Sequence, residues 1–499
     1  MTSTDDLGSL LRDPQLNHLS QLFDNAGYRL YLVGGSVRDL MMGREINDRD
    51  LCTSAPPQHV QQLVGRWADD VWPLGEKFGT IACRHDGVDF EITTFRSEKY
   101  DPSSRKPVVQ YADSVHDDLQ RRDFTINAMA ADLISGELLD PFDGRMDIER
   151  QVLRCPTNPA VCMQQDPLRM MRACRFRAQL GFDLDPQLFA AMSEMSHRLE
   201  VVSAERIRDE LSKMLVAGNP HWGIEAMDGV GLLKRVLPEL SACVGQEQDT
   251  RWHTADVFGH IMDVLRQTEP DLDLRLAALL HDIGKPMCAQ DGPHGPVFYG
   301  HQDVSAELAE AAMRRLRFPT DMIHRVSHLV RMHMRATEPI PWSVKALRRY
   351  VRDVGVDNLH DLHRLMAADR AAHHPQQAPQ LLQELDGLQS QLQELNSQEP
   401  LAGPPPALNG DQVMQLLGLR PGPQVGEVLR ALDEAQLDAG PMTEEQATAW
   451  LQDWWMRQHL AGEPPAPGSA GLRCRKCGRP ISSAESRATG LGPACRHSD

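Results

Sequence analysis

The chain has 499 residues, of which 41% are hydrophobic and 24% are charged, as is typical of soluble globular protein. At roughly 100 to 200 residues per domain this length allows three or four domains, and no apolar run approaches the roughly 18 residues that a membrane helix requires. The net charge of −18 argues against a surface that is basic throughout, so an RNA partner would need a local basic patch.

The first 150 residues carry both helix and strand patterns. An amphipathic helix at residues 16–24 leads into the alternating apolar run YRLYLV, which predicts a buried strand ending at Gly34 and Gly35. SVRDLMM then predicts a helix closed by Gly43, and DRDLCTSA, GTIACRHDG and VDFEITTFR predict further strands. Residues 1–150 are therefore expected to form a mixed α/β domain.

Helical patterns dominate from about residue 160 onward. They divide into residues 151–235, a histidine-rich segment at 236–375, and a segment at 376–460 in which residues 380–395 carry leucines at helical spacing. The Pro/Gly-rich residues 461–471 predict a linker. The cysteines before residue 290 are scattered singly and the first residues lack a signal-peptide pattern, so we expect reduced core cysteines in a cytoplasmic protein.

A glycine turn and an acidic pair favour a nucleotide site. Backbone N–H groups at Gly34 and Gly35 could hold a phosphate, with Arg38 one helical turn further on, although a plain strand-to-helix turn would look the same. Asp48 and Asp50 are two apart on a predicted strand, so both carboxylates face one side about 7 Å apart. That spacing suits divalent metal ions that bridge a triphosphate and a hydroxyl. Exposed acidic pairs are common, but the preceding glycine turn favours the nucleotide interpretation.

The stretch QQDPLRMMRACRFR, residues 164–177, could select a base. Cytosine and adenine both offer an amino donor beside a ring-nitrogen acceptor, whereas uracil and guanine reverse this polarity. Asp166 can accept and Arg169 can donate from one face of a helix start, so the pair fits C and A and rejects U and G. Arg172 and Arg175 follow around the helix and could reach phosphate or ribose. Alternatively, Asp166 before a proline is simply a helix-start signal.

Five motifs occur in the order found in one enzyme family. LVGGSVRD, NDRDLCTSA, KFGTI, RRDFTINAMA and DPLRMMRACRFRAQLGF resemble those of the bacterial class II tRNA nucleotidyltransferases, the CCA-adding enzymes, whose close relatives are the bacterial poly(A) polymerases. The resemblance is dense over residues 28–240 and looser to about 455. It implies an α+β multidomain fold, in which a polymerase-β-type nucleotidyltransferase head precedes an all-α neck, an HD body and a tail. The implied activity is Mg²⁺-dependent transfer of CMP and AMP from CTP and ATP to a tRNA 3′ end.

The resemblance also assigns residues to the nucleotide and its metal ions. These residues are Gly35, Arg38, Asp48, Asp50, Arg122, Asp166, Arg169, Arg172 and Arg175. Asp48 and Asp50 would be the catalytic Mg²⁺ ligands. Gly35 and Arg38 would contact the triphosphate, and Arg122 would contact the nucleotide.

Other positions near these motifs are less defined. Asp123 and Asn127 could organise the sugar side of the pocket. Either Asp89 or Glu91, which share a strand face, could supply a third carboxylate, and no motif decides between them. The family usually has Glu where this chain has Gln165, so we expect the arginine that this Glu orients to be held more loosely.

The histidine-rich segment resembles a second enzyme fold. His260, His281, Asp282 and Asp369 give the order H…HD…D of HD phosphohydrolases, in which such side chains bind a transition metal. Further histidines that would permit a second metal are His301, His328 and His333. Some bacterial tRNA nucleotidyltransferases carry a similar HD domain, linked to phosphatase or phosphodiesterase activity on 2′,3′-cyclic and terminal phosphates. The alternative is a metal-free remnant that serves as a tRNA platform.

The C-terminal part offers two further candidate sites. Gly422 and Gly426 flank a turn that opens a helix and could hold tRNA phosphate, although glycines also allow close helix packing. Residues 472–499 are predicted to form a basic zinc module, plausible as an RNA contact. Its expected Zn²⁺ ligands are Cys474, Cys477, Cys495 and His497.

Two alternatives to full CCA addition remain. One is a sibling activity, namely CC-only, A-only or poly(A) addition. The stretch from residue 95 to 123 resembles a full-length flexible loop, which CC-adding relatives shorten, and so favours complete addition. The other is an HD phosphohydrolase with an inactive head, which the intact Asp48 and Asp50 pair argues against.

Overall fold

The computed structural model describes residues 13–46, 49–72, 79–99, 108–112, 114–336, 341–398, 401, 407–440 and 442–460. The chain forms two compact units, Met1–Ile340 with Asp357–Gly387, and Pro341–Val356 with Leu388–Asp499. The first unit contains several of the predicted domains, so their exact limits stay predictions. The predicted linker at 461–471 and the predicted zinc module at 472–499 lie outside the described residues. Within the described ranges, no helix is long and apolar enough to cross a membrane.

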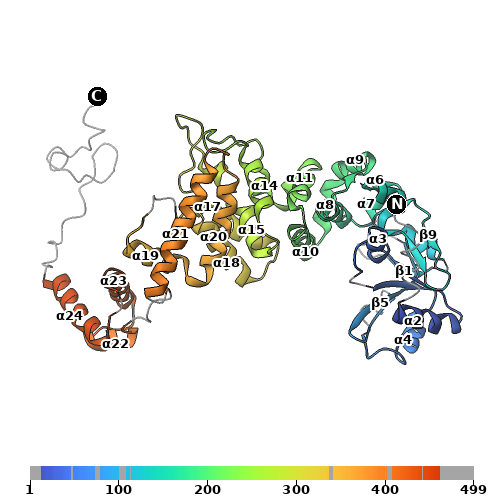
Figure 1. Ribbon diagram of the computed structural model, residues 1–499, viewed down its shortest axis with the longest axis horizontal. Coiled ribbons are helices and arrows are strands. Elements are labelled where there is room, and N and C mark those ends of the chain that lie inside the picture. Colours follow the sequence, from blue (N-terminus) through green and yellow to red (C-terminus); the bar gives the residue numbers. More distant parts are fainter. Residues whose placement is uncertain are drawn as a thin grey trace. The chain divides into compact units, whose positions relative to one another are not determined.

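A seven-stranded sheet forms the centre of the head (Figure 1). Its order is β3-β4-β5-β2-β1-β8-β9, in which β2 and β5 pair in parallel and the other neighbours are antiparallel. The strands are β1 Leu30–Val33, β2 Arg49–Thr53, β3 Asp70–Trp72, β4 Thr80–His85, β5 Val88–Thr94, β8 Ala130–Asp132 and β9 Leu138–Leu139. The predicted mixed α/β character of this region is confirmed.

Two short strand pairs lie outside this sheet. β6 Arg96–Lys99 pairs with β7 Val108–Tyr111, and β10 Val152–Leu153 pairs with β11 Asp183–Leu184. Residues past 160 are otherwise helical in the described ranges, apart from turns and two isolated bridges in the loop at 290–297. The predicted predominance of helix is therefore confirmed.

The two faces of the sheet have different roles because successive side chains of a strand point to opposite faces. Leu51 of β2 and Ile92 of β5 belong to the main apolar core of the head. Helices α2 Pro14–Asn25, α3 Gly35–Met41 and α4 Pro57–Val64 contribute buried apolar side chains to that core. Asp50 and Glu91, the neighbours of Leu51 and Ile92 in sequence, therefore point to the other face.

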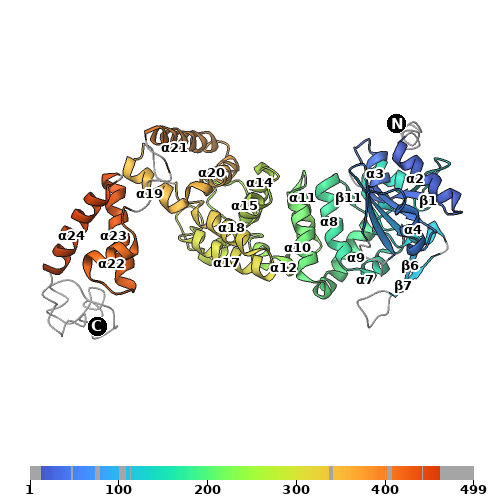
Figure 2. The same ribbon diagram turned by 90° about the horizontal axis from the view of Figure 1, so that it is seen from below.

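Helices make up the rest of the first unit (Figures 1 and 2). Those near the head are α5 Val115–Gln120, the 3₁₀ turn η2 Thr125–Asn127, α6 Gly144–Arg150, α7 Pro159–Gln165, α8 Leu168–Leu180 and α9 Pro186–Met195. Those that follow are α10 Ala204–Leu215, α11 Pro220–Gly229, α14 Val257–Gln267, α15 Leu272–Leu280, α16 Lys285–Cys288, α17 His301–Arg315, α18 Thr320–Met332 and α20 Val356–Ala371.

Helix α8 packs against α10 and α11. Gly223 of α11 allows this close approach, since a Cβ there would lie 2.7 Å from the Met214 side chain and 2.9 Å from the carbonyl oxygen of Cys174. The nucleotide-selecting residues predicted from sequence are on α8 or directly before it. The packing of α8 against its neighbours therefore fixes the backbone from which these side chains extend.

The second unit is a small helical body. It contains α19 Val344–Val354, the end of α21 Ala378–Gln398, α22 Gly410–Leu417, α23 Pro423–Ala439 and α24 Glu444–Leu460. Asn409 begins α22 with a capping box, in which it and Gln412 bond each other's backbone N–H groups. Gly422 directly precedes α23 and Gly426 lies in its first turn, so the predicted turn into a helix is present.

Candidate active site

A cavity of about 680 Å³ lies on the sheet face that carries Asp50. Eight residues assigned from sequence line it: Gly35, Arg38, Asp50, Arg122, Asp166, Arg169, Arg172 and Arg175. The ninth, Asp48, lies outside the described residues. Side chains that sequence reasoning missed also line it, including Arg96, Arg121, Phe176 and Arg206.

Two carboxylates stand side by side at the sheet. Asp50 on β2 and Glu91 on β5 are register partners in parallel strands, so they share a face about 5 Å apart. Asp89 instead bonds Arg84, with 2.6 Å between Oδ1 and Nε, and both side chains are exposed. Glu91 lines the cavity and Asp89 does not. Glu91 is therefore the one of the two that lies beside Asp50, and its role in catalysis stays a prediction.

The Gly34 turn makes room for an arginine. Gly34 has φ +70°, and a Cβ built there would lie 2.7 Å from Nη1 of Arg122. Both features favour glycine at this position. On the following helix, Arg38 donates to Asn127 Oδ1 over 2.8 Å and to Asp39 over 2.9 Å. The predicted tight turn and its arginine therefore both reach the cavity.

A buried aspartate holds two of the cavity's arginines. Asp118 is fully buried and accepts hydrogen bonds from Arg121 Nη2 over 2.6 Å and from Arg122 Nη2 over 3.1 Å. Burial alone would raise the pKa of Asp118, but the two guanidiniums outweigh it and the pKa is lowered. The spacing of three and four residues on one helical turn was the available sequence signal.

The residues predicted for the sugar side form one network. Asp123 accepts from Asn127 Nδ2 over 3.0 Å and from Arg172 Nε over 2.7 Å. Burial opposes ionisation, yet Arg172 and the other donors lower the pKa of Asp123 to about 2. Arg172 and Arg175 also lie 3.6 Å and 3.2 Å from carboxylate oxygens of Glu210 on α10. Both supporting arginines are thus held by acids.

The acid of the base-selecting stretch uses both of its oxygens. Asp166 Oδ1 accepts from the backbone N–H of Leu168, the first residue of α8, over 3.1 Å, while Pro167 holds the N-cap position. Oδ2 pairs with Arg206 Nη2 over 3.0 Å. A helix does start here, as the sequence indicated, but the N-cap is Pro167 and not Asp166. The contact with Leu168 is compatible with a carboxylate that lines the cavity beside Arg169.

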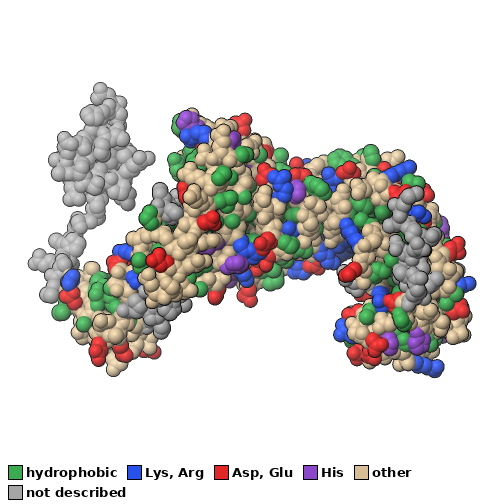
Figure 3. All heavy atoms as spheres, viewed as in Figure 1, with side chains coloured by type: hydrophobic (Ala, Val, Ile, Leu, Met, Phe, Trp, Pro, Cys, Tyr) green, Lys and Arg blue, Asp and Glu red, His purple; other side chains and the backbone are tan. Residues whose placement is uncertain are grey.

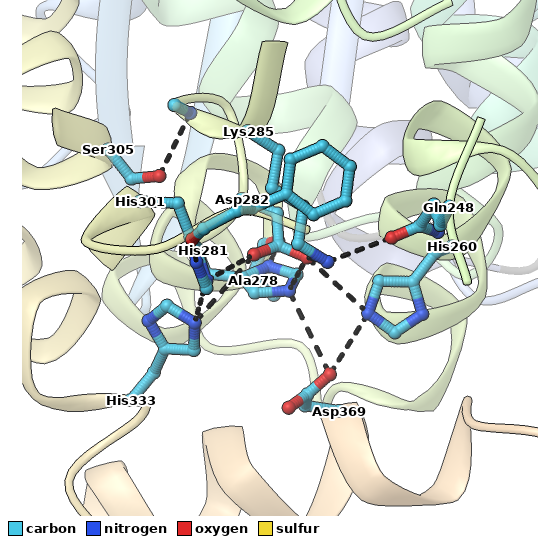
Figure 4. Close-up of polar contacts among 12 residues, drawn as sticks. Gln248, His260, Ala278, His281, Asp282, Lys285, His301, Ser305, His333 and Asp369 are labelled. Carbon is cyan, nitrogen blue, oxygen red and sulfur yellow. Dashed lines mark hydrogen bonds and ion pairs between the residues drawn. The ribbon is translucent and has the colours of Figure 1, made fainter. Parts of the chain in front are cut away.

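A second centre lies among the body helices (Figure 4). Ligand atoms of His260, His281 and Asp369 lie within 4.8 Å of one another, and those of Asp282, His301 and His333 form a second such group. The four HD residues predicted from sequence are thus brought together with two of the three extra histidines. His328 is in neither group. Lys285, which the sequence did not single out, places Nζ 2.7 Å from Asp282 Oδ2.

Backbone carbonyls orient three of these imidazole rings. Nδ1 of His281, His301 and His333 lies 2.8, 2.7 and 2.6 Å from the carbonyl oxygen three residues earlier. A carbonyl only accepts, so each Nδ1 donates and Nε2 keeps a lone pair for the centre. Burial lowers the pKa of His333 to about 3, whereas the pKa of His281 is raised, because the neighbouring Asp282 outweighs the effect of burial. The donor set therefore fits a transition metal.

The sheet, the carboxylates and the arginine-lined cavity define a nucleotidyltransferase head. A model of the poly(A) polymerase head domain matches residues 30–154, and a probable RNA and SrmB-binding site of polymerase A matches 181–243. An HD domain model matches 252–372, and a family of unknown function matches 465–498. The chain belongs to the tRNA nucleotidyltransferase family, as the following relatives show.

Three curated relatives match nearly their whole length. An A-adding tRNA nucleotidyltransferase of Deinococcus radiodurans is 36% identical, covering 85% of this chain and 95% of the relative. A CC-adding enzyme of Thermus thermophilus is 33% identical, covering 85% and 93%. A CCA-adding enzyme of Bacillus velezensis is 32% identical, covering 88% and 97%.

A solved structure shares the fold. The Bacillus stearothermophilus CCA-adding enzyme in complex with CTP superposes with a TM-score of 0.66 at 24% identity, covering 90% of this chain and all of that one. The expected α+β head followed by a helical HD region is confirmed by this match and by the family models.

Proposed function

We propose that this nucleotidyltransferase adds C and A to tRNA 3′ ends without a nucleic-acid template, using CTP and ATP. The carrying observation is one cavity that contains the Asp50 and Glu91 carboxylates together with Asp166 and Arg169. Relatives named CCA-adding, CC-adding and A-adding support the same substrates. On the face shown in Figure 3, basic and acidic side chains are interspersed, so a tRNA would have to be held by local groups of basic residues.

The cavity residues divide the work of nucleotidyl transfer. Adjacent carboxylates fit Mg²⁺, which prefers oxygen ligands, and Asp50, Glu91 and Asp48 would hold it. Such a metal would offset the charge of the triphosphate and activate the attacking 3′ hydroxyl. Arg38 and Arg122, beside the Gly34 turn, would donate hydrogen bonds to phosphate oxygens.

Base choice rests on the start of α8. The Asp166 carboxylate would accept the amino N–H of cytosine or adenine, and Arg169 would donate to the neighbouring ring nitrogen. Uracil or guanine would set donor against donor and acceptor against acceptor. Each unpaired group would cost about 1–3 kcal/mol, enough to reject the wrong base.

Asp166→Ala should admit UTP and GTP. Without its carboxylate the site no longer penalises the reversed edge, and we expect discrimination against these nucleotides to fall by roughly 10- to 100-fold. Incorporation kinetics for each nucleotide measure this. Asp185→Ala is the matched control, because Asp185 likewise accepts from backbone N–H groups at a helix start, those of Gln187 and Leu188. Unchanged base choice in Asp166→Ala would disprove the role.

One assay separates full CCA addition from its siblings. tRNA that lacks the terminal CCA is incubated with CTP, with ATP, and with both. CC followed by a single A is expected with both nucleotides. A product that ends at CC, addition of A only to tRNA ending in CC, or a long A tail would each identify a sibling activity. The long-loop argument for complete addition stays a prediction, since part of that loop lies outside the described residues.

A second activity, metal-dependent phosphate hydrolysis, is favoured by the histidine centre. Nε2 of His281 and of His301 point at Asp282, 3.1 Å from Oδ2 and 3.2 Å from Oδ1 respectively, and all three side chains are buried (Figure 4). Imidazole nitrogens and carboxylate oxygens that converge in a buried place are the ligands that transition metals use. His260, His281, Asp282 and Asp369 would hold a transition metal, with His301 and His333 available for another. The substrate class would be 2′,3′-cyclic or terminal phosphates of RNA ends.

Removing metal should abolish that hydrolysis and lower the melting temperature, because metal binds the folded state. His281→Ala should reduce bound transition metal, as measured by elemental analysis of the purified protein. His328→Ala should not, since His328 lies on α18 outside both groups. Full metal content in His281→Ala would contradict the assignment. A hydrolysis assay on 2′,3′-cyclic CMP then tests the activity itself.

The C-terminal appendage is proposed to bind Zn²⁺ through its cysteines. Cys474, Cys477 and Cys495, with His497, have spacing suited to a tetrahedral site. Their basic neighbours would contact tRNA. Equal zinc content in the full chain and in Cys474→Ser would refute this proposal.

A further inference from the structure

In the contacts that the structure describes, the Arg169 guanidinium donates to carbonyl oxygens, a sulfur and an amide oxygen. Its Nη1 donates to the carbonyl oxygen of Cys162 over 3.3 Å, to Sγ of the same residue over 3.0 Å, and to Oε1 of Gln165 over 3.2 Å. Its Nη2 donates to the carbonyl oxygen of Arg121. The residue is only 7% exposed. The direction in which its remaining N–H edge points is therefore set largely by α7.

The sulfur of Cys162 lies at the centre of this support. Cys162 is fully buried, and its thiol donates to the carbonyl oxygen of Asp123 over 3.6 Å. The same sulfur accepts from Arg169 Nη1, so Cys162 links α7, the Asp123 turn and the arginine.

Gln165 adds a second acceptor beside this sulfur. Arg169 Nη1 donates to its Oε1 over 3.2 Å, so this position offers the guanidinium a neutral amide oxygen. Cys162 and Gln165 are three residues apart on α7, so both side chains approach Nη1 from one face. Neither acceptor is a carboxylate, so each contributes a modest hydrogen bond. Losing either would leave Arg169 more freedom, and selective sites need their donors held within about 0.5 Å.

We propose that Cys162 is a positioning residue for base choice, whose sulfur fixes the Arg169 guanidinium so that it donates to the ring nitrogen of cytosine or adenine. The inference rests on the proposed template-independent addition of C and A. It concerns how sharply this chain discriminates, while the reaction itself is carried out by other residues.

Cys162→Ala tests the proposal by removing the sulfur. The ratio of kcat/KM for CTP to that for UTP should fall roughly three- to tenfold, the loss expected for one hydrogen bond. The effect should appear mainly in KM, because Arg169 contacts the base and not the reacting phosphate. Cys162→Ser keeps an acceptor and a donor at the same position, so it should restore most of the ratio.

Cys174→Ala is the matched control. Cys174 is equally buried, on the neighbouring α8, and it is not among the residues that line the cavity. Both alanine variants remove the same atoms from a packed interior, so Cys174→Ala shows how much of any effect comes from lost packing alone. A drop in the CTP to UTP ratio confined to Cys162→Ala supports positioning. An unchanged ratio, or an equal drop in Cys174→Ala, overturns it.

The same measurements separate this inference from the function beneath it. If the unmodified enzyme adds neither C nor A to tRNA, the proposed function fails and the inference falls with it. If the unmodified enzyme adds both and discriminates as well as Cys162→Ala does, only the positioning role is lost.

Discussion

Asp50→Asn should abolish nucleotide addition and leave the fold intact. The substitution keeps the size of the side chain but removes the charge that a divalent metal requires. We expect kcat to fall on the order of 10³-fold or more, equivalent to about 4 kcal/mol of transition-state stabilisation. Single-turnover incorporation of CMP into tRNA measures the loss. Glu91→Gln tests the neighbouring carboxylate in the same way.

Asp89→Asn is the internal control for both variants. Asp89 lies on β5, two residues from Glu91, and bonds Arg84 at the exposed surface. Its charge is the same and its strand face is shared, but it does not line the cavity. Near-normal kcat is expected for it. Comparable activity of Asp50→Asn and Asp89→Asn would exclude the proposed metal role of Asp50.

Asp118→Ala should be strongly destabilising. It removes a fully buried carboxylate and leaves Arg121 and Arg122 without that partner in the interior. Breaking a buried pair costs about 3–5 kcal/mol, because the remaining charge stays desolvated. Chemical denaturation should register this loss in the free energy of unfolding. Glu310→Ala breaks the exposed Arg314 pair and should cost less than about 1 kcal/mol.

The contribution of Asp118 also has a defined pH dependence. Its folded pKa is lowered, so its stabilisation is complete above the unfolded pKa of about 3.9 and is lost as pH falls through the folded value. The unmodified protein should therefore lose more stability than Asp118→Ala on acidification below about pH 4. Parallel stability curves in that range would contradict the ion-pair assignment.

Local patterns in the sequence were sufficient for most elements of the fold. Alternating apolar residues located β1, and the amphipathic period located α2 and α21, with limits within a few residues. The spacing of leucines along a helix and a glycine at its end can both be recognised within one short stretch of sequence. The grouping of α19 with the C-terminal helices was not foreseeable, since it depends on packing between distant segments.

In the candidate site too, residues in local motifs could be predicted, whereas residues placed by long-range contacts could not. Residues in compact motifs, such as Arg38 and Asp166, were predicted and line one cavity. Glu91 could not be chosen over Asp89 because both share a strand face, and only the pairing with β2 and the Arg84 contact separate them. Arg206 was missed because its partner is 40 residues away in the chain. Long-range contacts of this kind leave no local pattern.

The two carboxylate oxygens of Asp166 link the accuracy of nucleotide selection to the stability of helix α8. One oxygen accepts from the N–H of Leu168 in the first turn of α8, and the other pairs with Arg206. A substitution that relaxed base choice at this position would also loosen the helix that carries Arg169, Arg172 and Arg175. Variants that select bases less accurately would therefore tend to be less stable, and cellular proteolysis removes unstable proteins. Heritable change in nucleotide preference is expected to arise at flanking positions such as Gln165, whose side chain contacts Arg169 without bonding the first turn of α8 in the described contacts.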